Sequence, residues 1–180
     1  TRGFFPALFE TIKQSIVDPV NFFGRMRTDD DILSPLFYYW IVAGFSTLVG
    51  NLWQALFSLA GLAANPAAQQ LPPEVPPFLA SILSAQTSPF FYLQLAAGGI
   101  AFAPVVLFIY VGIFHLFAML FRCANRGFPA TLRSVAYSAG PMVLAIVPMC
   151  GSAIGGIWFL VLVVIGLWKT QRGSVGGAVG

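Results

Sequence analysis

Charge is scarce in this sequence. Only 8% of its 180 residues are charged and 58% are hydrophobic, whereas soluble domains average ~25% charged and ~45–50% apolar residues. Nine basic and six acidic side chains cannot cover the surface of a water-soluble fold of this length. The composition therefore predicts an integral membrane protein, and it excludes a disordered chain and a nucleic-acid binder.

Residues that carry chemistry are equally scarce. The sequence has one histidine and two cysteines, no cluster with metal-ligand spacing, and none of the glycine patterns that bind phosphate or dinucleotides. Cys123 and Cys150 fall on opposite sides of the membrane in the topology derived below, so we expect no disulfide between them. We therefore expect a protein that is not an enzyme, with no metal site and no cofactor.

Three consecutive acids, Asp29, Asp30 and Asp31, precede the first long apolar run. Carboxylates are ligands for hard cations, so one interpretation is a metal site. The favoured interpretation is a solvated cap on a helix N-terminus, where negative charge is stabilised by the helix dipole.

Long apolar runs dominate the rest of the chain, and four exceed or approach the ~20 residues that a spanning helix needs. They cover about 36–64, 90–121, 132–149 and 152–168. Pro104, which follows Gly98 and Gly99, predicts a bend in the second run, and the short 150–151 connection predicts a tight antiparallel hairpin. Each run is apolar on every face, which argues against barrel strands. The predicted fold is all-α, a polytopic transmembrane helix bundle with four spans.

Basic residues all lie on one side of a four-span topology. They are Arg2, Lys13, Arg25, Arg27, Arg122, Arg126, Arg133, Lys169 and Arg172. Lys and Arg collect on the cytoplasmic side of membrane proteins, so we expect a multi-pass topology with a cytoplasmic N-terminus.

The first 30 residues precede the transmembrane domain, which we place at 31–172 and which is followed by a Gly-rich tail at 173–180. Apolar residues recur at helical spacing in this N-terminal segment, at Phe5, Leu8, Phe9, Ile12, Ile16 and Val17. The pattern predicts an amphipathic helix that lies in the membrane interface and ends at Pro19. Aromatic side chains are expected to anchor it in the headgroup layer, namely Phe5, Phe9, Phe22 and Phe23.

Isolated polar residues inside the spans are candidates for lining a cavity. They are His115, Asn51, Gln54 and Gln94. Polar side chains at membrane depth face the bundle or a cavity. The favoured interpretation of His115 is a satisfied hydrogen bond between helices, and the alternative is a ligand or substrate contact. Small residues spaced by four, such as Gly151 and Gly155, predict close helix packing.

Three short motifs point to a family. Asp31-Ile-Leu-Ser-Pro35 precedes an aromatic run, Arg133 to Pro141 contains Tyr-Ser-Ala-Gly-Pro, and Asp18-Pro19 precedes a Phe-Phe pair. Together they resemble the Yip1 family of multi-span membrane proteins, in which an Asp-Leu-x-Gly-Pro-aromatic motif enters the first span and a Gly-Tyr-Ser-x-x-x-Pro region lies in the third. The matching positions are Asp31, Pro35, Tyr137, Ser138 and Pro141. Ser34 and Ala136 depart from the family pattern, which has glycine at these two places.

The resemblance implies a helical membrane bundle, usually of five spans, and the printed sequence stops at 173–180, where a fifth would start. Either this member lacks the fifth helix or the printed chain does not include it. Eukaryotic members bind small prenylated GTPases and act in vesicle traffic, but they carry a longer polar N-terminal region. The short loops here are similar to those of bacterial members, so we expect the bacterial inner membrane and assume no GTPase partner.

These features favour a non-enzymatic membrane protein that organises membrane or binds lipid, as a homo-oligomer. Arg122, Arg126 and Arg133 would contact anionic lipid headgroups, at ~1 kcal/mol per basic residue near the surface, although topology alone also explains such arginines. The alternative is a transporter or channel-like protein for a small solute or lipid, with its site near the bend at Pro104. A third option is an accessory subunit of a larger membrane complex.

Overall fold

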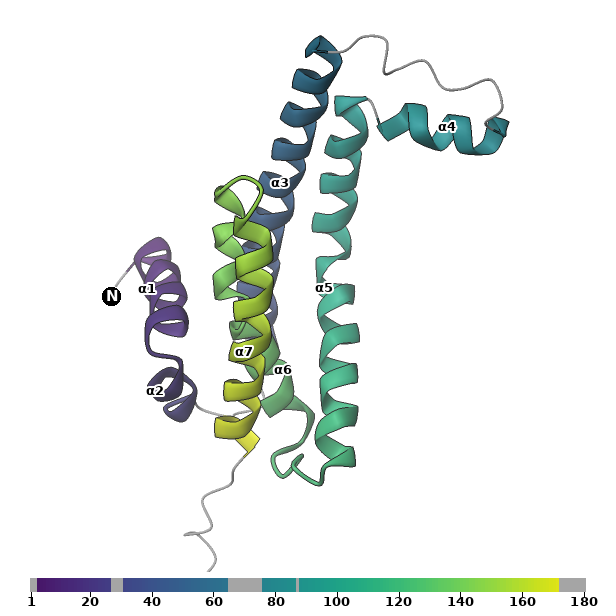
Figure 1. Cartoon of the computed structure of the whole chain (residues 1–180). Helices are drawn as coiled ribbons and strands as arrows, with labels where there is room; N and C mark the ends of the chain where they lie inside the picture. The colour runs from purple at the N-terminus through teal and green to yellow at the C-terminus, as the bar shows by residue number, and fades with distance from the viewer. Residues whose placement is uncertain (1–2, 27–30, 65–75, 87, 172–180) are drawn as a thin grey trace, which may run out of the picture.

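The computed structural model describes residues 3–26, 31–64, 76–86 and 88–171, and this part of the chain contains helices and no strand. Figure 1 shows the elements in chain order. They are α1 (Phe4–Val17), α2 (Pro19–Gly24), α3 (Leu33–Ala64), α4 (Pro77–Gln86), α5 (Pro89–Leu120), α6 (Gly127–Tyr137), the 3-10 helix η2 (Gly140–Ile146) and α7 (Gly151–Gln171).

Three of the described helices are long and apolar enough to cross a membrane. They cover Leu33–Gly61 of α3, Pro89–Leu120 of α5 and Gly151–Gln171 of α7. The prediction of spans near 36–64, 90–121 and 152–168 is therefore confirmed as helix, with ends that differ by no more than three residues. α5 continues through Pro104 as one helix.

The predicted third span, 132–149, is not one helix. α6 starts earlier, at Gly127, and ends at Tyr137, and η2 follows from Gly140 to Ile146. Pro141 explains the break, because it has no N–H for the helix ladder and its ring clashes with the carbonyl four residues before it. The count of four spans remains a prediction, since only three helices in the described part meet the length and hydropathy that a span requires.

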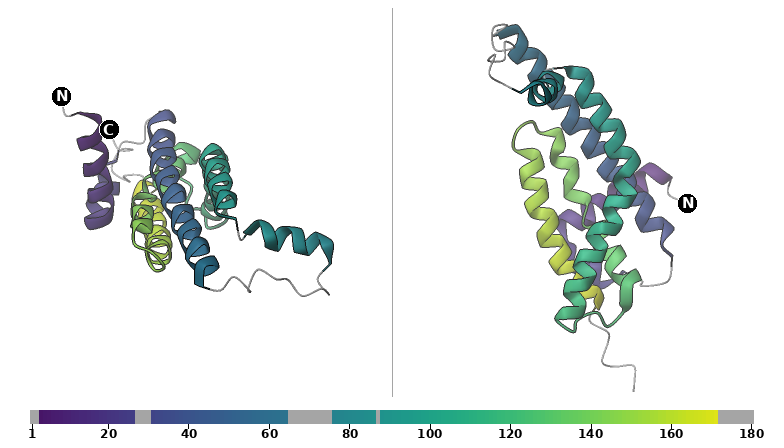
Figure 2. Two further views of the ribbon diagram at one scale, coloured as in Figure 1. Left: turned by 90° about the horizontal axis from the view of Figure 1, so that it is seen from above. Right: turned by 90° about the vertical axis from the view of Figure 1, so that its right-hand side faces the viewer.

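α3 and α5 pack along most of their length, as Figure 2 shows. Glycine makes this approach possible, because a Cβ on Gly99 would lie 2.7 Å from a methyl carbon of Thr47 and one on Gly44 would meet Ile100 at 3.7 Å. The indole of Trp40 also donates a hydrogen bond of 2.8 Å to the Ile100 carbonyl oxygen. Small residues and interhelical hydrogen bonds are the usual means of helix association in a bilayer.

The chain reverses before α7 as predicted, but the first arm of the hairpin is a 3-10 helix and the connection covers 147–150. η2 ends at Ile146, α7 starts at Gly151, and the two elements run back along one another (Figure 1). Gly155 lies against η2 so closely that a Cβ there would be 2.6 Å from the Pro141 carbonyl oxygen, and Gly151 lies in the same way against the Leu144 carbonyl. The spacing of small residues therefore serves packing within this chain.

The N-terminal segment forms two helices beside the bundle, and α1 runs obliquely to the long helices (Figure 2). Asp18 separates them by capping α2, with its carboxylate accepting from the Asn21 backbone amide at 3.4 Å and Pro19 at the first helical position. Leu8 and Ile12 pack against the core, so the apolar residues of α1 do not all share an outward face. The placement of α1 in the membrane interface remains a prediction.

The four phenylalanines expected to anchor this segment have different positions. Phe5 and Phe9 are exposed, with 78% and 68% of their surface accessible. Phe22 is half-buried, and Phe23 is only 1% exposed. The expectation is wrong for Phe23, because its ring packs over Gly166 of α7 so closely that a Cβ there would lie only 3.2 Å from it.

Candidate functional site

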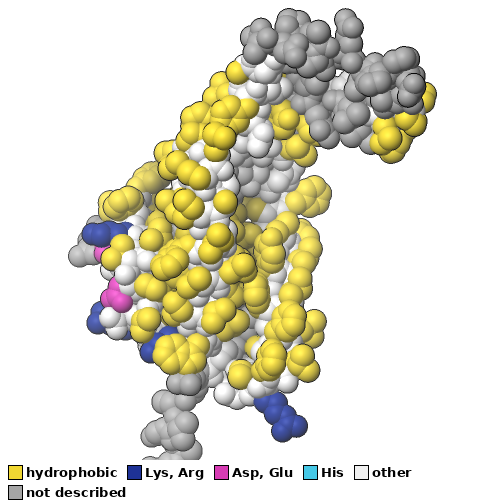
Figure 3. All heavy atoms as spheres, viewed as in Figure 1, with side chains coloured by type: hydrophobic (Ala, Val, Ile, Leu, Met, Phe, Trp, Pro, Cys, Tyr) yellow, Lys and Arg dark blue, Asp and Glu magenta, His cyan; other side chains and the backbone are white. Residues whose placement is uncertain are grey.

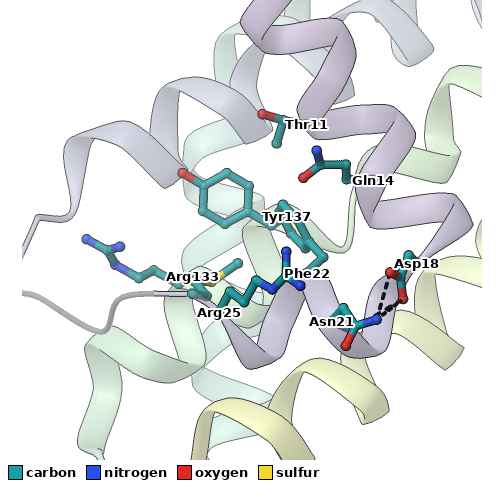
Figure 4. Close-up of a pocket in the computed structure, with 9 residues that line it drawn as sticks. Thr11, Gln14, Asp18, Asn21, Phe22, Arg25, Arg133 and Tyr137 are labelled. Carbon is teal, nitrogen blue, oxygen red and sulfur yellow. Dashed lines mark hydrogen bonds between the residues drawn. The ribbon is translucent and has the colours of Figure 1, made fainter.

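α1 and α2 enclose a polar hollow of about 450 Å3 against α6, which Figure 4 shows. It is lined by Thr11, Gln14, Asp18, Asn21, Phe22, Arg25, Met26, Arg133 and Tyr137. These residues come from two segments that are far apart in the sequence, 11–26 and 133–137, so the hollow exists only because α1 and α2 pack against α6.

A single glycine fixes α1 in this position. Ser15 is fully buried, and a Cβ on Gly140 would collide with its Oγ and lie 3.2 Å from the hydroxyl of Tyr38. The Ser15 hydroxyl donates to the Ile12 carbonyl oxygen at 2.8 Å, which satisfies it inside the contact. The wall of the hollow is therefore anchored in the core by a contact that only glycine allows.

Arg133 brings positive charge into the hollow from within the bundle. It is only 7% exposed, and its Nη2 donates to the Asp31 carbonyl oxygen at 3.0 Å. Arg25 lines the same hollow from the end of α2 and is exposed. The acidic lining residue, Asp18, is held by Asn21, whose Nδ2 donates to the carboxylate at 2.8 and 3.1 Å. Arg25 and Arg133 thus both line the hollow, with side chains that extend in different directions (Figure 4), and the Asp18 carboxylate is already hydrogen bonded.

Asp31 lies next to this charge and caps α3. Its carboxylate accepts from the backbone amides of Leu33 at 3.1 Å and Ser34 at 3.4 Å. Hydrogen bonding from Ser34, with a smaller contribution from the charge of Arg133, lowers the pKa of Asp31 below its usual value. The cap interpretation fits Asp31, whereas Asp29 and Asp30 lie outside the described residues. In the described part, no group of three His, Cys, Asp or Glu side chains is placed to hold a metal ion.

A second, apolar hollow of about 490 Å3 adjoins the first and shares Thr11 and Tyr137 with it. Its other lining residues are Phe4, Ala7, Leu8, Leu33, Ser34, Phe37, Tyr38 and Ile41. It lies between α1 and the first turns of α3, where the first candidate span begins. The ring of Tyr137 stands at the boundary and packs on Tyr38 with a centroid distance of 4.8 Å and on Phe22 at 5.9 Å.

The family-motif positions gather around these two hollows. Asp31 caps α3 beside Arg133, Pro35 is fully buried in its first turn, and Tyr137 lines both hollows. Ser138 is buried and donates to the Ser134 carbonyl oxygen at 2.6 Å. Pro141 lies at the start of η2, next to the glycine that seats α1. The motifs therefore describe one corner of the fold although they are widely separated in the sequence.

The three arginines predicted to contact lipid headgroups lie in two different places, and their contact with lipid remains a prediction. Arg133 is buried and lines the polar hollow, whereas Arg122 and Arg126 are exposed in the connection between α5 and α6. The second arginine at the hollow is Arg25, which the sequence analysis treats only as a charge that indicates topology. Its position two residues after the Phe-Phe pair, Phe22 and Phe23, is the signal that could have identified it.

Most Lys and Arg side chains that can be seen in Figure 3 lie toward the half of the molecule away from α4. The apolar surface above them is broad and covers α3 and α5 (Figure 3). This separation of charge from apolar surface agrees with basic residues on a single side of the membrane.

The four polar candidates for a transport cavity do not meet. His115 contacts α6 through a distance of 2.9 Å between its Nδ1 and Oγ1 of Thr131, as the favoured interpretation expects. Asn51 donates to the Thr47 carbonyl oxygen of its own helix at 2.8 Å. Gln94 is exposed, and Gln54 lines a separate pocket of about 410 Å3 between α3, η2 and α7 that contains none of the other three.

His115 instead belongs to a buried polar network that joins α5, α6 and α7. Gln171 is its centre: Nε2 donates to Oγ1 of Thr131 at 2.9 Å and to the Gly127 carbonyl oxygen at 3.1 Å. Oε1 of Gln171 accepts from the Arg126 backbone amide at 2.8 Å. Next to this group the hydroxyls of Ser134 and Thr170 are hydrogen bonded at 2.6 Å. The network holds the end of α7 against the start of α6 and so supports the element that carries Arg133.

Comparison with known proteins identifies the family. A sequence model of the Yip1 domain matches residues 13–179, which include the end of α1 and every later helix from α2 to α7. No curated protein and no solved structure matches the chain. Since the match covers nearly all of the 180 residues, the chain belongs to the Yip1 family of membrane proteins.

Proposed function

We propose that this integral membrane protein is not an enzyme and that it binds anionic membrane lipid at the corner formed by α1, α2 and α6. The observation that carries the proposal is the polar hollow, which is lined by two arginines, Arg25 and Arg133, from different parts of the chain. Arginine binds phosphate through paired N–H donors, which makes it the preferred residue for planar, bidentate recognition.

The surroundings of the hollow support a lipid over a soluble anion. Phe4, Phe5 and Phe9 are exposed on α1, beside the start of the first candidate span. Aromatic and apolar side chains on one surface of a helix bury themselves at the boundary between headgroups and acyl chains. A phosphate that reaches the arginines at this depth is one attached to a membrane lipid.

In the same proposal the protein lies in the bacterial inner membrane with a cytoplasmic N-terminus and organises membrane as a homo-oligomer. The anionic surface of the cytoplasmic leaflet attracts basic residues near the membrane by ~1 kcal/mol each, which suits Arg122 and Arg126 as accessory contacts for lipid. A transporter finds less support, because the polar residues expected to line its pathway are distributed over separate places.

Lipid retention measured by native mass spectrometry tests the proposal. The purified protein is exchanged into detergent with equal amounts of phosphatidylglycerol and phosphatidylcholine. We expect retained phosphatidylglycerol to exceed phosphatidylcholine, and we expect Arg25→Gln to lower this preference about fivefold, the equivalent of ~1 kcal/mol. Lys13→Gln is the matched control, since Lys13 is an exposed cation of the same segment that does not line the hollow.

Equal losses in Arg25→Gln and Lys13→Gln would contradict a defined site and leave only general surface charge. The mass of the released assembly tests the oligomer in the same experiment. A stoichiometric foreign subunit in place of a homo-oligomer would make the chain an accessory subunit of a larger complex.

A further inference from the structure

We propose that the polar and the apolar hollow form one bipartite site for a single lipid molecule, with the phosphate headgroup beside Arg25 and Arg133 and one acyl chain between α1 and α3. This inference rests on the proposed function and adds to it the way in which the lipid is recognised. It begins from the position of the two hollows next to one another, with Thr11 and Tyr137 as shared lining residues.

The chemistry changes across this shared boundary. On one side lie two arginines with Gln14 and Asn21, and on the other lie the apolar side chains of Leu8, Phe37 and Ile41 together with others of α1 and α3. Each hollow falls within the ~300–1,000 Å3 that is usual for small-molecule sites. A ligand that fills both must be an amphiphile with an anionic head and an apolar tail.

The order of the two hollows matches the order of a lipid in a bilayer. The apolar hollow is lined by Leu33, Phe37 and Ile41, which occupy the first turns of the first candidate span. The polar hollow is lined by residues of α1, α2 and α6 and of the loops that flank α2, and all of them lie outside the three candidate spans. A lipid bound across both would therefore keep its chain on the membrane side and its phosphate outside, as it does in the leaflet.

The walls of the site are fixed before a ligand binds. Ser15 of α1 is buried against Gly140, and Tyr137, which stands between the hollows, is packed by Tyr38 and Phe22. Arg133 is held by the Asp31 carbonyl oxygen. A site that is already ordered loses little conformational entropy when the ligand binds, which favours a defined lipid site over a loose annular contact.

The chain-binding half is tested by filling it. Ala7 lines the apolar hollow, so Ala7→Trp places an indole where the acyl chain would lie. The matched control is Val17→Trp, since Val17 is exposed on the same helix and lines neither hollow. The probes are lysophosphatidylglycerol, which has one chain, and glycerophosphoglycerol, which has the same headgroup and none. Binding of both is measured by calorimetry on the detergent-solubilised protein.

We expect Ala7→Trp to weaken lysophosphatidylglycerol binding at least tenfold and to leave glycerophosphoglycerol binding unchanged, while Val17→Trp alters neither. We expect Arg25→Gln to weaken both. Unchanged lysophosphatidylglycerol binding in Ala7→Trp, with Arg25→Gln still weakened, would overturn the bipartite site and leave the proposed function standing. If Arg25→Gln has no effect on either probe, the proposed function itself fails. Equally tight binding of uncharged monoolein would also overturn the inference, because the headgroup would then contribute nothing.

A measurement on the unaltered protein removes any dependence on how Ala7→Trp folds. A phosphatidylglycerol with a photoreactive diazirine in one acyl chain is crosslinked in nanodiscs, and the adducts are mapped by peptide mass spectrometry. We expect adducts on the apolar hollow, at Leu8, Phe37 and Ile41. Adducts confined to the outer surface of α5 would overturn the bipartite site.

Discussion

α5 and the α6–η2 segment lie in the same bundle and were both expected to be membrane spans, yet they differ in how much of their surface is buried. α5 is an unbroken helix of 32 residues, of which five small or aliphatic residues are buried. In α6 every residue from Ala130 to Ala136 is buried, and the chain then tightens into a 3-10 helix. α5 exposes a broad apolar surface on the outside of the bundle. α6 and η2 form the centre around which the other elements pack.

This difference determines where specific residues can act. A helix surface that faces lipid needs only apolar side chains, because lipid tails are as apolar as leucine. Polar groups in the centre need partners inside the protein, and the hydroxyls of Ser134 and Ser138 find them by donating to carbonyl oxygens of α6. Both residues of α6 that line the polar hollow, Arg133 and Tyr137, are therefore positioned by a fully packed element.

The contact of η2 with α7 is expected to tolerate the least change. Gly155→Leu places a side chain against the Pro141 carbonyl, where a Cβ alone would already lie at 2.6 Å. Overpacking usually costs ~1–3 kcal/mol, and more where backbone has to move. We expect at least ~3 kcal/mol of lost stability, seen as aggregation or a large drop in melting temperature in detergent. Gly156→Leu is the control, since no atom lies within 4 Å of a Cβ there, and equal damage by both would contradict this account.

The hydrogen-bond network around Gln171, which joins the end of α7 to the start of α6, should show the next largest effect on stability when it is disrupted. Gln171→Leu leaves the Arg126 amide and the Gly127 carbonyl without their shared partner. An unsatisfied buried group costs ~1–3 kcal/mol, so a clear decrease in melting temperature is expected, together with faster hydrogen exchange at the Arg126 amide. Thr170→Val tests the neighbouring hydroxyl pair and should leave that amide protected. Unchanged exchange in Gln171→Leu would show that the network does not hold α7 to α6.

The contrast between the two segments also explains what could be predicted from sequence. α3, α5 and α7 were predicted within three residues at each end, because a charge-free apolar run long enough to span a bilayer is sufficient to identify such a helix. The α6–η2 segment is also apolar, but its limits depend on Pro141 and on contacts with α1 and α7, which hydropathy does not record.

The candidate site shows the same limit. Arg133 could be named from the sequence, because an arginine inside an apolar motif is unusual. Arg25 could not be distinguished from the other topological charges, since it reaches the hollow only when α2 docks through Phe23 into the space above Gly166. From the sequence alone the Phe-Phe pair was expected to anchor the chain in the membrane, but one of its two rings, that of Phe23, is part of the core.

The cap of α3 offers a smaller test that depends on pH. Hydrogen bonds from Ser34 lower the pKa of Asp31 below its ordinary value of 3.8, so its contribution to stability is present above that value and is lost as the pH falls through the lowered folded-state pKa. Asp31→Asn keeps a capping side chain but removes this dependence. We expect a small decrease in melting temperature at neutral pH that disappears in strong acid. A difference between the two proteins that stays constant with pH would contradict the assignment.

The outer surface of α5 should respond least of all. Leu116 is 66% exposed, and in a membrane this surface is covered by lipid tails, so Leu116→Ala exchanges one apolar contact for another. We expect a change within about 0.5 kcal/mol, as for ordinary surface substitutions. The matched change on the inner surface, Leu107→Ala, removes a fully buried side chain and is expected to cost ~2–5 kcal/mol through the cavity that it leaves. Melting temperatures of both variants in lipid nanodiscs give the comparison. If Leu116→Ala destabilised the protein as much as Leu107→Ala, the outer surface of α5 would have to be packed against protein and not against lipid.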